Sequence, residues 1–147
     1  VPGYEAPVNG VYSARNRSAA IRIPLISNDP AAKRLEVRFP DSSGSPHLAF
    51  SALLAAAMDG IERGLDPGEP VEHDIYELPE ARRAALKRAP PSLYAALDAL
   101  EADHAYLTSR SILDPETVRA YIAFKRAELA EFETYVTPRE FELSFDC

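Results

Sequence analysis

Basic side chains gather in residues 4–40 of a chain that is acidic as a whole. This region holds six of the 16 lysines and arginines and three acids, a balance of +3, whereas residues 41–147 hold the other 10 bases and 20 of the 23 acids. The basic residues are Arg15, Arg17, Arg22, Lys33, Arg34 and Arg38, and the acids are Glu5, Asp29 and Glu36. A guanidinium offers a planar fork of donors that binds a carboxylate or a phosphate through two hydrogen bonds. The cluster therefore predicts a site for an anionic ligand.

Two short segments of this region alternate apolar and polar residues with the period of a β-strand. Residues 20–25 read AIRIPL and residues 35–39 read LEVRF. The apolar residues of the second segment are expected to face a core, which places Glu36 and Arg38 together on the other face. That face could hold a metal ion with the acid and an anionic ligand with the arginine. It could also be a surface ion pair worth at most about 1 kcal/mol, and spacing alone favours this simpler interpretation.

Several motifs, in one order and spacing, resemble a known family. The chain carries GYEAP near its start, RNRSAAIRIP and KRLEVRFPD in the basic cluster, then PHLAFSALLAAAMDGI, LDPGEP and DIYELP, and EFELSF at its end. Together they resemble the C-terminal part of bacterial type I glutamine synthetase over essentially all 147 residues. We therefore expect a fragment of the catalytic domain. Residues 1–40 would form active-site strands and loops, and residues 41–147 would be mainly helical with a C-terminal tail.

The resemblance implies that three residues are catalytic. Glu5 in GYEAP resembles the family's flap glutamate, which closes the site over glutamate and takes a proton from ammonium. Arg17 in RNRS and Arg22 in IRIP resemble the arginines that steady the transferring phosphate, so both are also expected to bind the nucleotide. Such cations stabilise the charge on the phosphoryl oxygens during transfer.

The resemblance implies binding roles for three further residues and a modification at a fourth. Arg34 resembles the arginine that contacts the nucleotide phosphates, and Glu36 resembles a ligand of the metal beside the nucleotide. Arg38 resembles the arginine that grips the side-chain carboxylate of glutamate. Tyr76 in DIYELP matches the tyrosine that is adenylylated in many bacterial members, which implies an adenylylating enzyme as a possible partner.

The implied reaction joins ammonia to glutamate at the expense of ATP, through γ-glutamyl phosphate, and needs Mg²⁺ or Mn²⁺. The family's assembly is a dodecamer of two stacked rings. Because most of the family's metal ligands come from segments that precede those matched here, we expect the isolated chain to be inactive. Two other functions stay open. One is a sister ligase that joins glutamate to a polyamine or another amine, and the other is a non-catalytic assembly protein derived from the same fold.

Composition and charge indicate the general class of protein and exclude some partners. A chain of 147 residues, 46% hydrophobic and 27% charged, is expected to fold as one globular domain. Its one cysteine, Cys147, suits a reducing cytoplasm. With a sequence pI of about 5.0 and no extended basic face, nucleic acid is not an expected partner, and no apolar run is long enough to predict a membrane span.

The remaining segments predict an α+β fold, in which a few antiparallel strands from an incomplete curved sheet pack with three main helices. Helical spacing and capping residues predict the helices over residues 47–64, 92–107 and 114–136. Residues 65–91, rich in proline, are expected to be a long irregular stretch that carries Tyr76. The tail alternates Phe141, Leu143 and Phe145 with polar residues, so it is expected to need an apolar partner, which in the family is a subunit of the opposite ring.

Overall fold

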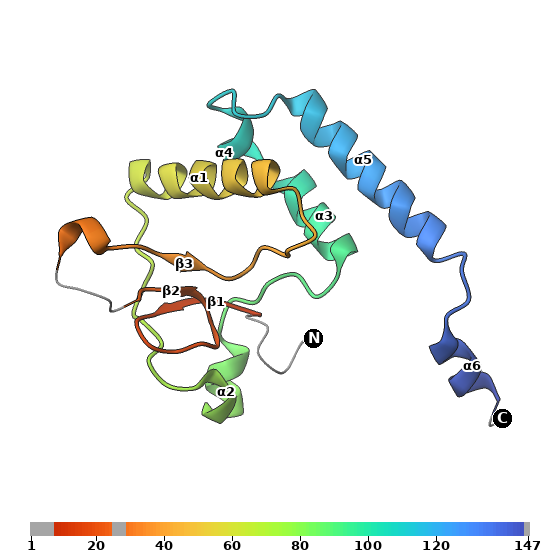
Figure 1. The fold of residues 1–147 in the computed structure, drawn as a ribbon, viewed down its shortest axis with the longest axis horizontal. Helices are drawn as coiled ribbons and strands as arrows, with labels where there is room; N and C mark the ends of the chain where they lie inside the picture. The colour runs from red at the N-terminus through yellow and green to blue at the C-terminus, as the bar shows by residue number, and fades with distance from the viewer. Residues whose placement is uncertain (1–7, 25–28, 146–147) are drawn as a thin grey trace. The chain divides into compact units, whose positions relative to one another are not determined.

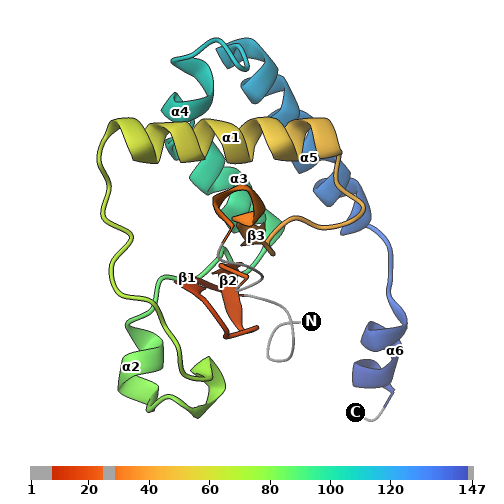
Figure 2. The same cartoon turned by 60° about the vertical axis from the view of Figure 1, so that its left-hand side comes forward.

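The computed structural model describes residues 8–24 and 29–145. The chain divides into two compact units, Val1–Pro91 and Ser92–Cys147. The first unit holds the strands and the helices α1 and α2, and the second holds the helices α3 to α6 (Figures 1 and 2). The α+β class predicted from the sequence is confirmed.

The first unit contains an open three-stranded sheet in the order β1-β2-β3. Strand β1 spans Asn9–Ser13, β2 spans Ala19–Arg22 and β3 spans Glu36–Val37. Strands β2 and β3 are antiparallel as predicted, but β1 and β2 are parallel, so the sheet is mixed. The expected antiparallel pairing thus holds for β2 and β3, whereas β1 is parallel to β2 because the turn after β1 carries the chain back to the start of that strand, where Asn9 pairs with Ala19.

The apolar face of the third strand is more open than predicted. Leu35 and Phe39, which flank β3, are 65% and 45% exposed. Strand β3 lies at one edge of the described sheet, and its pairing with β2 continues only to the Arg38 amide, which donates to the Ala20 carbonyl at 2.8 Å. The prediction that the apolar side chains of this segment face a core is therefore wrong for Leu35 and Phe39, which lie just outside the two-residue strand β3 at the edge of the described sheet.

Helix α1 spans Pro46–Glu62 and follows the predicted boundaries closely. Pro46 takes the first helical position, where its missing amide hydrogen costs nothing. Ser45 is the N-cap residue, although its side chain makes no capping hydrogen bond. Gly64 ends the helix with φ of +59°, and the next amide, that of Leu65, donates back to the Gly60 carbonyl at 2.9 Å. A glycine tolerates this left-handed conformation without strain.

The prediction that this helix is tightly packed in a core is wrong for the described residues. Ala55 is its one buried residue. The four large side chains Phe50, Leu54, Met58 and Ile61 are exposed, and their spacing of four, four and three residues places them in one stripe. The helical spacing of small and apolar residues predicted a helix, but it did not determine which face is buried.

The irregular stretch after α1 contains two short helical turns. The 3₁₀-helix η2 spans Ile75–Glu77 and the helix α2 spans Glu80–Ala84. Ile75 is fully buried, whereas its neighbour Tyr76 is 38% exposed. Asp74 caps η2 by accepting a hydrogen bond from the Tyr76 amide at 3.0 Å. A second 3₁₀-helix, η1, spans Pro30–Ala32 ahead of β3.

The second unit is a set of helices built around α3 and α5. Helix α3 spans Leu93–Ala102, α4 spans Ala105–Thr108 and α5 spans Pro115–Phe132. The predicted helix over 92–107 is thus interrupted before α4, and the one over 114–136 ends early. The buried apolar residues of this unit are Leu97, Leu107, Val118 and Ile122. None of the described helices is both long and apolar enough to cross a bilayer.

A charged contact ties α3 to α5. The Nη2 atom of Arg126 donates to the carboxylates of Asp98 at 2.6 Å and Glu101 at 2.7 Å. These two hydrogen bonds raise the pKa of Arg126, the one from Glu101 being the larger cause. Asp98 and Glu101 are exposed and Arg126 is partly buried, so this contact is open to solvent.

The tail forms a short helix, α6, over Pro138–Ser144. The Thr137 amide donates to the Glu140 carboxylate at 2.8 Å, which anchors the first turn. Phe141 and Phe145 lie one turn apart with ring centroids 5.9 Å from each other, and both rings are largely exposed. The alternation of polar and apolar residues therefore lies on a helix, where Phe141 and Phe145 share one side and Leu143 lies on another.

We expect the stability of the first turn of α5 to depend on pH through Asp114. Its carboxylate accepts hydrogen bonds from the Thr117 side chain and then the Thr117 amide, and these lower the pKa of Asp114 below its ordinary value of 3.8. Because the folded pKa is the lower one, the cap stabilises α5 above pH 3.8 and is lost as the pH falls through the folded value. We expect the Thr117 amide, followed by NMR hydrogen exchange, to lose protection over that acidic range.

The variant Asp114→Asn is the matched control for this effect. Asparagine is an equally good N-cap residue and does not titrate. Protection of the Thr117 amide should therefore stay constant across the same pH range in this variant. An identical loss in both proteins would show that the Asp114 cap is not its cause.

Candidate functional site

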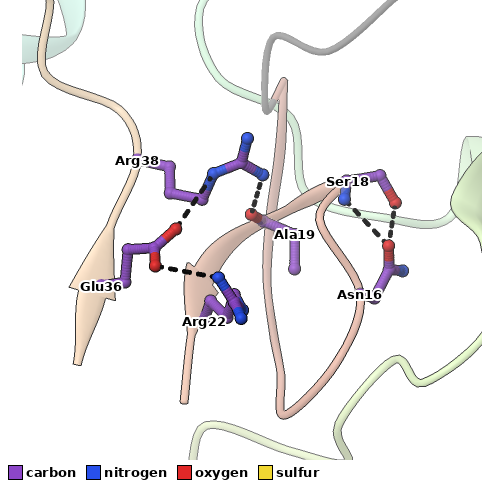
Figure 3. A network of polar contacts seen from close by, with 6 residues as sticks. All are labelled: Asn16, Ser18, Ala19, Arg22, Glu36 and Arg38. Carbon is purple, nitrogen blue, oxygen red and sulfur yellow. Dashed lines mark hydrogen bonds and ion pairs between the residues drawn. The ribbon is translucent and has the colours of Figure 1, made fainter. Parts of the chain in front are cut away.

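Glu36 lies between two arginines on the sheet, as Figure 3 shows. The Nη1 atom of Arg22 lies 3.1 Å from Glu36 Oε2, and the Nε atom of Arg38 lies 3.5 Å from Glu36 Oε1. The sheet register produces this arrangement, because Arg22 on β2 pairs directly with Glu36 on β3 and Arg38 follows two residues later. The ion pair between Glu36 and Arg38 predicted from spacing is confirmed, and we call the three residues the charged triad.

The charged triad is partly solvated and carries one net positive charge. The side chains of Arg22, Glu36 and Arg38 are 31%, 42% and 22% exposed. Pairs with this much solvent contribute about 0–1 kcal/mol each to stability, so their main effect is to fix where the guanidinium groups point. Arg38 is held further by donating to the Ala19 carbonyl at 3.5 Å.

The Arg22 guanidinium retains capacity for another partner. Its Nη1 atom contacts Glu36 and its Nε atom is buried without a hydrogen-bond partner among the described residues, so a further partner would contact the other guanidinium nitrogens. Since Glu36 neutralises only one of the two arginines, the charged triad can still bind an anion such as a carboxylate or phosphate.

A second polar network lies beside the triad, in residues 13–18, which we call the arginine turn. Arg15 and Arg17 are exposed on this turn, and Asn16 between them is half-buried. The Asn16 Oδ1 atom accepts hydrogen bonds from the Ser18 amide at 2.8 Å and the Ser18 hydroxyl at 2.6 Å (Figure 3). Ser13, fully buried, accepts from the amides of Arg15 and Asn16. The turn thus holds its own shape while it displays the two arginines.

The predicted site residues do not all meet in the described residues. The charged triad brings together Arg22, Glu36 and Arg38. Arg17 and Arg34 are exposed on neighbouring segments, and Tyr76 lies on η2. Glu5 lies outside the described residues, so its predicted position is not tested.

Reasoning from the sequence missed two features of this site. Arg22 and Glu36 are 14 positions apart in the sequence, and their pairing depends on the register of two strands, which no local sequence pattern specifies. The roles of Ser13, Asn16 and Ser18 were also missed, although serine and asparagine at close spacing are typical of a hydrogen-bonded turn.

The described residues do not by themselves form a metal site. Among them, no group of three or more histidine, cysteine, aspartate or glutamate side chains is placed to hold a metal ion. Magnesium and similar hard cations take about six oxygen ligands, only some of which are water. Glu36 has spare lone pairs beyond its two arginine contacts, so it can supply one ligand of a site completed by other groups.

The charged triad and the arginine turn thus place several guanidinium groups on one α+β unit, an arrangement that suits the binding of an anion. The sequence model of the glutamine synthetase catalytic domain matches residues 1–144. The chain belongs to the glutamine synthetase family.

Two curated relatives and one solved structure show what share of a family member's length the chain covers. It is 53% identical over 146 residues to glutamine synthetase from Aquifex aeolicus, and 52% identical over 147 residues to that from Streptomyces coelicolor. Each match covers 99% of this chain and 31% of the relative. A cryo-electron microscopy structure of glutamine synthetase from Plasmodium falciparum matches with a TM-score of 0.84 and 30% identity, over 97% of this chain and 35% of that one. The chain therefore spans about a third of the length of these relatives.

Proposed function

We propose that these residues are the C-terminal portion of the catalytic domain of an enzyme that ligates ammonia to glutamate with ATP. The charged triad is the observation that carries the proposal, because it offers a fixed guanidinium for a carboxylate and a second one for a phosphate. We propose that residues 1–40 supply active-site strands and loops of this domain, and that residues 41–147 supply supporting helices and the tail.

In the proposed reaction the side-chain carboxylate of glutamate attacks the γ-phosphorus of ATP, which forms γ-glutamyl phosphate and releases ADP. Ammonia then attacks the acyl carbon and inorganic phosphate leaves. Bound ATP supplies the phosphoryl group, and a divalent cation offsets its charge. The described residues alone do not hold that cation, so Glu36 is proposed as one ligand among several.

Each proposed residue has a defined task. Arg38, oriented by Glu36 and the Ala19 carbonyl, holds the side-chain carboxylate of glutamate in line with the phosphate. Arg17 and Arg22 balance the charge that develops on the phosphoryl oxygens, and Arg34 binds the nucleotide phosphates. Glu5 is proposed to take a proton from ammonium, so that neutral ammonia is the nucleophile.

Ligation of ammonia is favoured over the two alternatives. The curated relatives described above are named glutamine synthetases, whereas a polyamine or amine ligase would use the same phosphate chemistry with another acceptor. A non-catalytic assembly protein has no need for a fixed charged triad. We also propose, on family grounds, a dodecameric parent assembly, adenylylation at Tyr76 and a cytoplasmic location.

The substitution Arg38→Lys in a complete synthetase subunit that carries these residues tests the proposal. Lysine keeps the charge but loses the fork that binds a carboxylate in two places. Since hydrogen bonds between charged groups contribute about 1.5–3 kcal/mol, we expect the KM for glutamate to rise about 10- to 100-fold. Steady-state ADP release measured against glutamate and ATP in turn would separate the two substrates.

Arg63→Lys is the matched control, because Arg63 forms an exposed ion pair with Asp59 on α1. This variant should leave both KM values unchanged. A rise confined to the KM for ATP in Arg38→Lys would contradict the proposed role and assign Arg38 to the nucleotide.

A further inference from the structure

Residues 71–75, which we call the anchor segment, run alongside the arginine turn. The Val71 amide donates to the Tyr12 carbonyl at 3.0 Å, just ahead of the turn. The Glu72 carboxylate then accepts hydrogen bonds from the Ser13 hydroxyl and the Ala14 amide, each at 3.2 Å. These contacts join two parts of the chain that are more than 55 residues apart in sequence.

The middle and far end of the turn are joined to the anchor segment as well. The Nδ2 atom of Asn16 donates to the carbonyls of Val71 at 3.3 Å and His73 at 2.5 Å. The Ile75 amide donates to the Ser18 hydroxyl at 3.4 Å, and Ile75 itself is fully buried. The anchor segment therefore contacts the turn along its whole length.

The Asn16 side chain makes four hydrogen bonds, two within the turn and two to the anchor segment, whereas Ser13 and Ser18 each make one to the anchor segment. Its Oδ1 atom accepts twice from Ser18 within the turn, and its Nδ2 atom donates twice to the anchor segment. This uses the full capacity of a side-chain amide, two donors and two acceptor positions. Aspartate would retain only the acceptors. Because Arg17 lies between Asn16 and Ser18, both neighbours that fix its backbone are fastened.

We propose that Asn16 is a positioning residue that aims the Arg17 guanidinium by fastening the arginine turn to the anchor segment. The inference rests on the proposed role of Arg17 in stabilising the transferring phosphate. The fastening also reaches the neighbouring Tyr76, since the Asp74 carboxylate that caps the Tyr76 amide belongs to the anchor segment. A displacement of the anchor segment is therefore transmitted to Arg17 through Asn16. Hydrogen bonds of this partly buried network depend on one another, which makes the loss of one partner costly.

A double-mutant cycle in the complete synthetase tests this proposal. Asn16→Asp keeps the contacts to Ser18 and removes both donations to the anchor segment. We expect kcat to fall about tenfold in the otherwise unaltered enzyme and less than about twofold in an Arg17→Ala background, because residues that act through one another are not additive. Equal losses in the two backgrounds would overturn the proposal, since a merely structural role would not depend on Arg17.

Two further measurements make the outcome unambiguous. His73→Ala is the matched control, because it removes a side chain from the anchor segment and keeps the carbonyl that Asn16 contacts, so kcat should stay unchanged. If Asn16→Asp does not fold, Asn16→Ser takes its place in the same cycle, because serine is uncharged and lacks the amide that donates to the Val71 and His73 carbonyls, and the expected and contrary results are the same.

Hydrogen exchange separates a failure of this inference from a failure of the proposed function. In Asn16→Asp the Ile75 and Tyr76 amides should exchange at least about tenfold faster than in the unaltered protein, whatever the reaction catalysed. Unchanged exchange would overturn the fastening itself. Faster exchange in a protein without synthetase activity would instead contradict the proposed function and leave no role for Arg17 in phosphate transfer.

Discussion

Replacing Glu36 by alanine in a complete synthetase subunit is expected to lower glutamine synthesis by about 100-fold or more. The carboxylate lies between Arg22 and Arg38, so its removal leaves two guanidinium groups without the charge that offsets their repulsion and orients them. The same change removes the one metal ligand that we propose in the described residues. Both effects lower kcat, and the loss of orientation at Arg38 also raises the KM for glutamate.

The reaction is best followed by ADP release at varied glutamate and varied Mg²⁺ or Mn²⁺. A higher cation concentration for half-maximal rate would reflect the proposed role of Glu36 as a ligand, and a higher KM for glutamate would reflect its contact with Arg38. Glu36→Gln, which keeps the shape and loses the charge, should fall between the unaltered enzyme and Glu36→Ala. Glu80→Ala is the matched control, because Glu80 forms an exposed pair with Arg83 on α2. Activity of Glu36→Ala within about threefold of the unaltered enzyme would contradict the role of the triad.

The 147-residue chain on its own is expected to produce no glutamine. Its described residues include no cluster of three or more side chains that could hold a metal ion, and a hard cation needs several oxygen ligands. The chain also spans 31% of the length of the relatives it matches, so most of a synthetase subunit has no counterpart in it. Positioning and charge stabilisation supply nearly all of the rate of phosphoryl transfer, and both need a complete site.

This prediction is checked by a coupled assay for glutamate-dependent ADP release with the purified chain. The Glu36→Ala chain, purified in the same way, controls for contaminating synthetase, and a complete synthetase confirms that the assay works. Turnover that rises with the concentration of the chain and disappears in Glu36→Ala would contradict the expectation. It would show that 147 residues assemble a working site.

The sequence by itself determined the family and the local elements of this protein. The motifs from GYEAP to EFELSF identified the family that the comparisons then showed. Local chemistry set the ends of the helices, as at Pro46, Gly64 and Asp114, because caps and left-handed turns depend on residues within a few positions of one another. The neighbouring places of Glu36 and Arg38 followed from the two-residue period of a strand.

Only the tertiary structure decided which distant segments meet. The parallel pairing of β1 with β2, the contact between Arg22 and Glu36, and the fastening of the arginine turn to the anchor segment all join residues that no local pattern relates. Strand register and hydrogen-bond partners depend on the folded path of the whole chain, and so does the face that a helix buries. For that reason α1 was predicted as a helix but not as one that exposes Phe50, Leu54 and Ile61.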